Sequence, residues 1–231
     1  MRESRWNKIL VEEAENPALE LAVESLDCIR GDRMLFRDLS FSLTGGRSLL
    51  LQGANGSGKT SLLRILAGYL PAESGRVKLK IGGIDHEREM ATHYVGHKDG
   101  IKAQFTVREN LLFWGQFFGS GIGSGSNNDE TPQLDDFLMR FNLWDLREIP
   151  SNLLSAGQKR RLCLARLLIA RRDLWLLDEP SHALDRDSQA LLADVMKSHL
   201  DSGGMVIATT HIPLGLDFDN NLVLGEEYLP T

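Results

Sequence analysis

The chain has few cysteines, no excess of positive charge and no long hydrophobic run. Its two cysteines, Cys28 and Cys163, lack the spacing of a metal site, so we expect reduced thiols in a cytosolic compartment. A net charge of −6 argues against a nucleic-acid partner. No stretch approaches about 18 consecutive apolar residues, and residues 1–20 contain no uninterrupted apolar core, so we expect neither a membrane span nor a signal peptide. Any contact with a membrane must then come through partners only.

Residues 48–68 contain the most informative motif of the chain. The apolar run 49–51 predicts a buried strand, and apolar residues at helical spacing from Leu62 predict a helix that stops at Gly68. Between them, the sequence matches G-x-x-x-x-G-K-[ST] at every fixed position. The motif reads Gly53-Ala54-Asn55-Gly56-Ser57-Gly58-Lys59-Thr60. Because strand and helix flank it in the required order, a phosphate-binding loop is favoured over a glycine-rich turn without a ligand.

The chemistry of this loop follows from its residue types. Glycines let backbone N–H groups approach phosphate oxygens closely, and the start of the following helix adds a positive dipole end. Lys59 would then reach the β- and γ-phosphates, and the Thr60 hydroxyl would bind Mg²⁺. We therefore expect residues 53–61, Gly53 through Ser61, to bind the phosphates of a nucleotide.

A composition of 42% hydrophobic and 25% charged residues over 231 positions fits one large or two small globular domains. Strands are expected at residues 19–27, 35–43, 77–81 (an edge strand), 93–97, 174–177 and 205–208. Helices are expected at residues 107–118, 134–146, 156–171 and 188–200, with a loop at 119–132. Thr106 and Glu109 have the spacing of a capping box. The basic residues of the third helix are interpreted as a solvated face: Lys159, Arg160, Arg161, Arg166, Arg171 and Arg172.

Two acidic residues, Asp178 and Glu179, directly follow the apolar run 174–177. In a parallel sheet, ligands bind beyond the carboxyl ends of the strands, so these carboxylates should face the phosphate loop. Asp178 is placed to bind Mg²⁺, directly or through water, and Glu179 to polarise the attacking water. An acidic pair alone is weak evidence, but it becomes strong beside the phosphate-loop motif.

These motifs together resemble those of the ATP-binding subunits of ABC transporters, over nearly the whole chain. Residues 154–158, Leu154-Ser155-Ala156-Gly157-Gln158, are similar to the family signature. The resemblance implies that Ser155, Gly157 and Gln158 face the γ-phosphate held by the other subunit of a head-to-tail homodimer. It also implies a D-loop at residues 181–185 and a switch histidine, His211, that contacts the γ-phosphate.

The resemblance further implies the fold. We expect an α/β P-loop NTPase core, mainly a parallel sheet with helices on both faces, with an antiparallel β subdomain and an inserted α-helical subdomain. Residues 1–231 would form one ABC ATP-binding domain. Its nucleotide-binding core would comprise residues 19–99 and 155–231, and the helical insert, residues 100–154, would end in the signature and dock onto a membrane partner.

Two positions depart from the family pattern. His97 stands where most members have a glutamine between the core and the helical subdomain, and it could hydrogen-bond the nucleophilic or a metal-bound water, with a charge that depends on pH. The aromatic residue that usually stacks on adenine is missing near Gly31, so Arg30 or Arg33 would stack its guanidinium on the base.

Four segments narrow the resemblance to the ATPase of cytochrome c maturation systems, the haem exporter ATP-binding subunit: residues 96–102, 105–111, 154–161 and 174–180. It implies integral membrane partners (CcmB-like and CcmC-like) and a peripheral location on the cytoplasmic face of the bacterial inner membrane or the matrix face of the mitochondrial one. The connection with haem is implied by this resemblance alone. The ATPase of another small-substrate exporter and a soluble ABC-type assembly factor stay open as alternatives.

Overall fold

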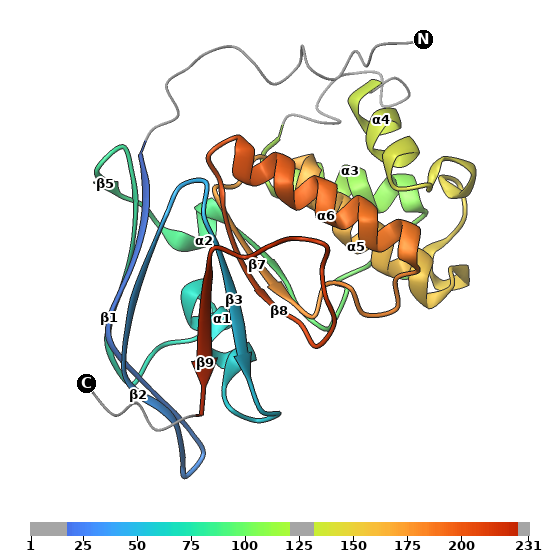
Figure 1. The fold of residues 1–231 in the computed structure, drawn as a ribbon. Helices are drawn as coiled ribbons and strands as arrows, with labels where there is room; N and C mark the ends of the chain where they lie inside the picture. The colour runs from blue at the N-terminus through green and yellow to red at the C-terminus, as the bar shows by residue number, and fades with distance from the viewer. Residues whose placement is uncertain (1–17, 121–131, 226–231) are drawn as a thin grey trace.

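The computed structural model describes residues 18–120 and 132–225 as two β-sheets and a group of helices (Figure 1). The antiparallel sheet has the order β2-β1-β4-β5. Its strands are β1 (Leu19–Arg30), β2 (Arg33–Thr44), β4 (Ser74–Ile81) and β5 (Ile84–Asp85). The prediction of an edge strand at residues 77–81 was wrong, because Gly82 and Gly83, both at positive φ, turn the chain back so that β5 pairs beside β4.

The second sheet is parallel throughout and has the order β6-β7-β8-β3-β9. Its strands are β3 (Ser48–Gly53), β6 (Thr92–Val95), β7 (Leu174–Asp178), β8 (Met205–Thr209) and β9 (Asn220–Leu224). Sequence analysis missed β9, because two asparagines open it and the strand is mostly exposed. The predicted class of fold, a mainly parallel core with an added antiparallel sheet and helices, is confirmed.

The described residues contain α1 (Lys59–Leu66), α2 (Arg88–Ala91), α3 (Val107–Phe117), α4 (Pro132–Arg140), α5 (Ala156–Ile169), α6 (Arg186–Asp201) and the 3₁₀ turns η2 (Trp144–Leu146) and η3 (Ser151–Leu153). The capping box before α3 is confirmed: Glu109 N donates to Thr106 Oγ1 and Thr106 N to Glu109 Oε2. The helix expected to reach residue 146 ends earlier, because Asn142 adopts a left-handed conformation. Most of the loop expected at 119–132 lies outside the described residues.

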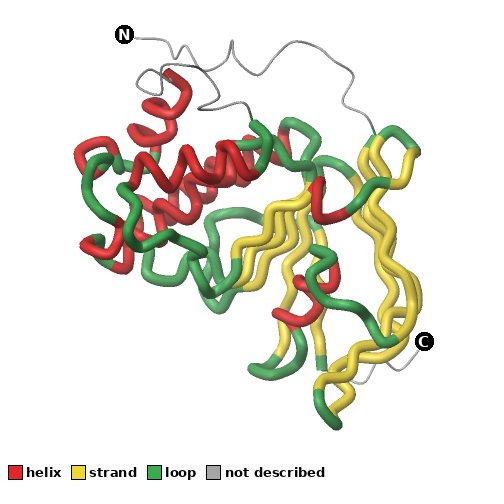
Figure 2. The backbone as a smooth tube through the Cα atoms, turned by 180° about the vertical axis from the view of Figure 1, so that it is seen from behind, coloured by secondary structure: helices red, strands yellow, loops and turns green. Residues whose placement is uncertain are grey.

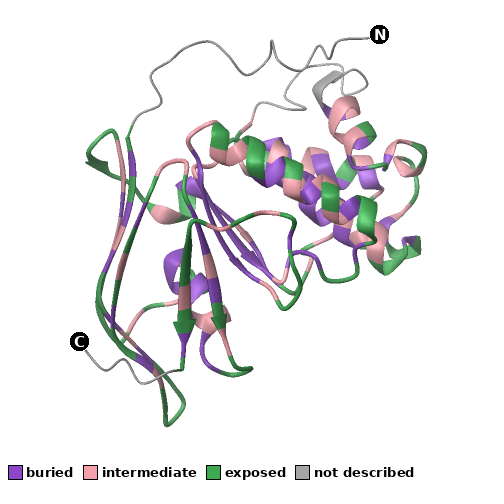
Figure 3. Ribbon diagram, in the orientation of Figure 1, coloured by how far each residue is buried: buried purple, intermediate pink, exposed green. Residues whose placement is uncertain are grey.

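The neighbouring strands β7 and β8 of the parallel sheet each contribute to two cores. In β7, Leu174 and Leu176 pack with α1 and the antiparallel sheet, whereas Trp175 and Leu177 pack with the helices α3 to α6. This alternation follows from the two-residue period of a strand, and burial on both faces explains why β7 reads as a continuous apolar run. Figures 1 and 2 show the resulting layers, with α1 between the two sheets and the larger helices beyond the parallel sheet. The buried residues concentrate in these layers (Figure 3).

Two histidines lie at the edge of the helical core, His93 buried and His199 half-buried. His93, in β6, is 1% exposed; its Nε2 lies 2.8 Å from the carbonyl oxygen of Ala170, and its ring packs edge-on against Phe118. His199, in α6, stacks on Trp175. Burial lowers the pKa of His93 to about 3 and the pKa of His199 to about 4, so both rings are neutral at pH 7.

The protein should therefore lose stability as the pH falls below about 6.5. The unfolded chain binds protons on these rings near that pH and the folded chain does not, so acid favours unfolding. For His93 the loss at pH 5 relative to neutral pH is on the order of 2 kcal/mol, from about 1.4 kcal/mol per pKa unit. Urea unfolding at several pH values measures this loss of stability. His93→Gln should flatten the dependence, and the exposed control His86→Gln should not; equal slopes in both variants would contradict this account.

No helix in residues 18–120 or 132–225 combines the length and the apolar character needed to cross a bilayer.

Candidate nucleotide site

The loop between β3 and α1 is shaped by glycines at positive φ. Gly53, Gly56 and Gly58 have φ angles of 137°, 81° and 106°, a region that side chains disfavour. A Cβ on Gly53 would clash with the carbonyl oxygen of Leu224 in β9, so the loop also needs glycine for space. Ser57 is buried and its hydroxyl makes no hydrogen bond within the described residues. The backbone thus forms a concave turn that leads into a helix N-terminus.

Lys59, the first residue of α1, bends back over this turn. Its Nζ donates to the carbonyl oxygens of Gly53 at 2.6 Å and Ala54 at 3.1 Å. The ammonium group therefore lies above the loop rather than in solvent. A positive charge in that place, next to a helix N-terminus, can neutralise the phosphate groups of a ligand.

Asp178, at the end of β7, is held by two threonine hydroxyls. Thr60 Oγ1 donates to Asp178 Oδ2 at 2.8 Å, and Thr209 Oγ1 donates to Asp178 Oδ1 at 2.9 Å. The carboxylate side chain is 2% exposed. β7 and β8 are parallel neighbours, with Asp178 opposite Thr209 in register, so the sheet itself sets this contact. The structure thus brings the acid after β7 to the start of α1, as predicted.

Glu179 turns away from the strand and meets His211. Its backbone has a φ of 50°, which is unusual for a residue with a side chain and persists only where the surroundings enforce it. Glu179 Oε1 lies 3.3 Å from His211 Nε2, and the His211 amide donates to Glu179 Oε2 at 3.3 Å. The Glu179 amide donates to Thr209 Oγ1 at 2.9 Å. The glutamate is therefore fixed through both backbone and side chain.

One cavity of about 600 Å³ collects most of the predicted site. It is lined by Arg30, Leu35, Asn55, Gly56, Gly58, Lys59, Thr60, Ser61, His97, Asp178, Glu179 and His211. His97 Nε2 lies 3.6 Å from Asp178 Oδ2, and both the His97 and the His211 side chains are 61% exposed. The polar groups therefore converge on a space open to a ligand. Gly53 lines an adjoining cavity that it shares with Lys59 and His211.

The cavity wall near Arg30 belongs to the antiparallel sheet. Arg30, at the end of β1, pairs in register with Arg33 at the start of β2, and both are exposed. Leu35 of β2 lines the same wall, and a Cβ on Gly58 would lie 3.1 Å from its Cβ. Sequence analysis missed Leu35, because a leucine in an alternating strand gives no signal beyond core packing.

The residues of the signature do not line this cavity. Ser155 caps α5: Gln158 N donates to Ser155 Oγ at 3.2 Å and Ser155 N donates to Gln158 Oε1 at 2.8 Å. Gly157 lies against the carbonyl oxygen of Ala183, which a Cβ would approach to 3.1 Å. Ser155 is exposed, so the N-terminus of α5 faces outward at a separate place on the surface. The signature thus lies outside the cavity that contains the phosphate loop, although Ala156 lines a neighbouring cavity together with His97 and Glu179.

The interpretation of the basic residues of α5 as a solvated face was wrong for Arg160 and Arg166. Arg160 is 4% exposed, and Arg166 Nη2 donates to the carbonyl oxygen of Tyr94 at 2.6 Å. Beyond the helix, Arg172 Nη2 donates to Phe118 O at 3.0 Å. The reason is geometric, because strand ends, the edge of a sheet and a helix C-terminus leave carbonyl groups without partners, and a guanidinium offers five donors to them. Sequence analysis also gave Thr209 no role, although it binds both acids.

The residue types at the cavity suit a magnesium ion. Hard divalent cations prefer oxygen ligands, and the Thr60 hydroxyl and Asp178 carboxylate meet at 2.8 Å beside the phosphate loop. Within the described ranges no group of three or more histidine, cysteine, aspartate or glutamate side chains could hold a metal. The donor set therefore fits an ion that completes its shell with phosphate oxygens and water, as Mg²⁺ does in nucleotide sites.

A model of the ABC transporter family matches residues 36–182. The chain therefore belongs to this family, and it is an ATP-binding, ATP-hydrolysing member, as its motifs predicted. Solved structures support the fold: an ATP-binding subunit of an ABC transporter aligns with a TM-score of 0.76 at 20% identity, covering 88% of this chain and 85% of that one. A putative ABC transporter ATP-binding protein from Pyrococcus furiosus gives 0.70 at 22%, covering 89% and 97%.

The curated relatives are more specific. The cytochrome c biogenesis ATP-binding export protein CcmA of Rhizobium meliloti (strain 1021) is 45% identical, over 85% of this chain and 93% of its own. The protein of the same name from Brucella abortus (strain 2308) is 42% identical, over 86% and 88%. The predicted resemblance to ATP-binding subunits of cytochrome c maturation is confirmed.

Proposed function

We propose that the chain is the ATP-hydrolysing subunit of an ABC complex for cytochrome c biogenesis, where it powers haem export or release of a haem-carrying chaperone. The observation that carries this proposal is the 45% identity to a cytochrome c biogenesis ATP-binding export protein over 93% of that protein's length. The converging cavity supports the ATPase part, because it combines a phosphate loop, a lysine and two acids.

Each residue at the cavity has a proposed task. Residues 53–61 bind the phosphates through backbone N–H groups and Lys59. Thr60 and Asp178 would hold Mg²⁺, which supplies charge neutralisation between the phosphates when bound. Arg30 packs on the base in place of an aromatic ring.

Hydrolysis needs a group that takes a proton from water. Glu179 is the proposed base, because its carboxylate lines the cavity and its backbone is fixed. His211 holds the glutamate side chain in place from the end of β8 and meets the γ-phosphate. His97, 3.6 Å from Asp178, orients a water molecule at the ion or at the phosphate.

A second copy completes the site in this proposal. The exposed cap at Ser155, with Gly157 and Gln158, offers a helix N-terminus suited to an anion, yet it lies outside its own chain's cavity. Head-to-tail pairing of two copies places this surface on the partner's γ-phosphate. ATP then links the two copies, and its hydrolysis allows the copies to separate.

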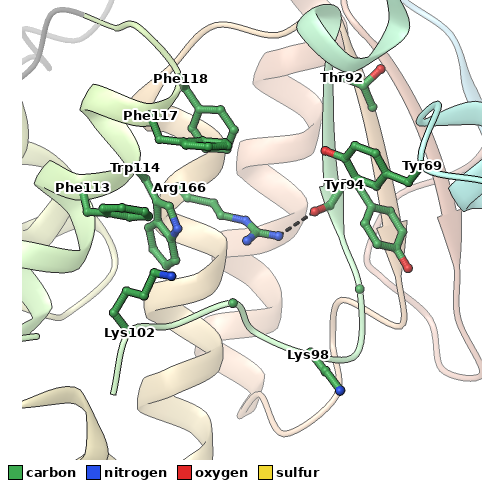
Figure 4. A pocket seen from close by; sticks show the side chains of 12 residues that line it. Tyr69, Thr92, Tyr94, Lys98, Lys102, Phe113, Trp114, Phe117, Phe118 and Arg166 are labelled. Carbon is green, nitrogen blue, oxygen red and sulfur yellow. Dashed lines mark hydrogen bonds between the residues drawn. The ribbon is translucent and has the colours of Figure 1, made fainter. Parts of the chain in front are cut away.

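A groove beside β6 suits a membrane partner. It has a volume of about 370 Å³ and is bordered by Tyr69 and Tyr94 on one side and by the aromatic residues of α3 on the other (Figure 4). Phe117 is 72% exposed there, and Lys102 lies 5.1 Å from the ring of Phe113. Exposed rings beside a lysine favour a segment with an apolar face from an integral membrane subunit, CcmB-like or CcmC-like. The chain would be peripheral on the cytoplasmic or matrix face.

Disruption of the gene should remove covalently bound haem from c-type cytochromes and spare b-type ones. The intact gene should restore haem staining. Phe117→Asp should not restore it, and this variant should fail to co-purify with the membrane subunits. Ile84→Asp, at an exposed residue of the antiparallel sheet, is the matched control and should behave like the intact chain. Normal c-type cytochromes after disruption would favour another exporter, and a chain without a membrane partner would favour a soluble assembly factor.

A further inference from the structure

Arg160 is a buried charge in the helix that begins with the signature. It lies in α5, five positions after the capping residue Ser155, and is 4% exposed. A buried guanidinium is costly unless all its donors are paired. Its position on a helix that mainly carries core leucines therefore calls for a reason beyond packing.

Within the described residues, the hydrogen bonds of Arg160 go to the segments at the ends of two parallel strands. At the end of β7 and just beyond it, its Nε donates to Pro180 O at 3.0 Å, and its Nη2 donates to Glu179 O at 2.7 Å and Asp178 O at 3.4 Å. Beyond β6, its Nη1 donates to Gly96 O at 3.0 Å and to Asp99 Oδ1 at 3.1 Å. The two segments that it joins carry Glu179 and His97.

The backbone of Glu179 is thus held at both polar groups. Arg160 holds its carbonyl oxygen, and Thr209 accepts from its amide. This residue also has the unfavourable φ of 50°, a conformation that persists only where the surroundings enforce it. Gly96, on the other side of the guanidinium, directly precedes His97. One planar group therefore sets the relative position of the acid after β7 and the histidine after β6.

We propose that Arg160 is a positioning residue that fixes Glu179 and His97 for hydrolysis and ties both to the signature-bearing helix of the same chain. The proposal rests on the proposed ATPase function and deepens it. A shift of α5, whose N-terminus faces the second copy in that function, would move the guanidinium and hence the acid. When the two copies close on one another, each copy would in this way affect the hydrolytic centre of its own chain as well as that of its partner.

Lysine cannot replace the forked guanidinium group of Arg160, because one ammonium group cannot span carbonyl groups on two strands. Arg160→Lys should lower kcat for ATP hydrolysis by at least about tenfold while the Kd for ATP changes less than about twofold, because the hydrogen bonds of Arg160 within the described residues do not reach residues 53–61. Asp99→Asn, which weakens one of its contacts, should lower kcat about threefold. Arg140→Lys, at the end of α4, is the matched control and should leave both constants unchanged.

The full-length chain is assayed with Mg-ATP turnover, nucleotide titration and thermal unfolding. An unchanged kcat in folded Arg160→Lys, or a proportional loss of kcat and ATP affinity, would overturn the positioning role and leave the ATPase intact. If Arg160→Lys does not fold, Asp99→Asn decides: reduced kcat with unchanged Kd supports the proposal, and unchanged kcat overturns it. Absence of hydrolysis by the unmodified chain would overturn the proposed function and this inference together.

Discussion

Replacing Glu179 with Gln should abolish ATP turnover while ATP binding persists. The amide keeps the size of the side chain but cannot accept a proton from water, and general-base catalysis contributes about 10²- to 10⁴-fold to a rate. Binding should survive, because the Lys59 ammonium is held by the carbonyl oxygens of Gly53 and Ala54 and not by Glu179. Phosphate release and titration with a fluorescent ATP analogue measure the two properties separately.

Glu20→Gln is the matched control for this variant, since Glu20 is an exposed residue of β1 far from the cavity wall. It should hydrolyse ATP at the unmodified rate. Undiminished hydrolysis by Glu179→Gln would refute the assignment of Glu179 as the base. Loss of both binding and turnover would instead point to a structural role for its contacts with His211.

Replacing Lys59 with Met should remove most of the affinity for ATP. Methionine retains the apolar stem but has no charge to meet the phosphates, and a hydrogen bond between charged groups contributes roughly 1.5–3 kcal/mol, or about 10- to 100-fold in Kd. The fold should tolerate the change, because Lys59 Nζ bonds only to carbonyl oxygens at the rim of the loop. Isothermal titration with Mg-ATP gives the constant, and thermal unfolding checks the fold.

Lys197→Met provides the comparison, because Lys197 is an exposed residue of α6. Its affinity for ATP should equal that of the unmodified chain. An affinity within about twofold of normal in Lys59→Met would mean that the phosphates do not lie over this loop, and the nucleotide site would have to be sought elsewhere.

The sequence predicts those parts of the fold that depend on local pattern. The apolar run before Asp178 and the capping box at Thr106 each produce the expected element, because periodicity and capping act over a few residues. The short strands β5 and β9 carry no such pattern, since pairing with a neighbouring strand decides them. The place where α4 stops depends on the backbone of Asn142, and apolar spacing does not show it.

The difference between local sequence pattern and contacts formed only in the folded chain also applies to the site. Lys59, Thr60, Asp178 and Glu179 stand in motifs whose spacing reflects a strand followed by a loop, so their meeting in one cavity follows from the topology. Arg160 carries no motif of its own. Apart from the Asp99 carboxylate, its partners are carbonyl oxygens, which every residue has, and only the folded strands show which of them lack a partner nearby. Tertiary contacts with backbone groups are therefore the part of a site that a sequence conceals.

The position of β3 between β8 and β9 bears on how the molecule folds as it is synthesised. Both neighbours of β3, β8 and β9, lie more than 150 residues further along the chain. The hairpin β1–β2 can form as soon as its residues are synthesised. In contrast, β3, which leads into the phosphate loop, cannot pair with its neighbours until the last part of the chain is synthesised. Until then the apolar side chains of β3 are exposed and can associate with other apolar surfaces. This strand is therefore a segment to which a chaperone would bind.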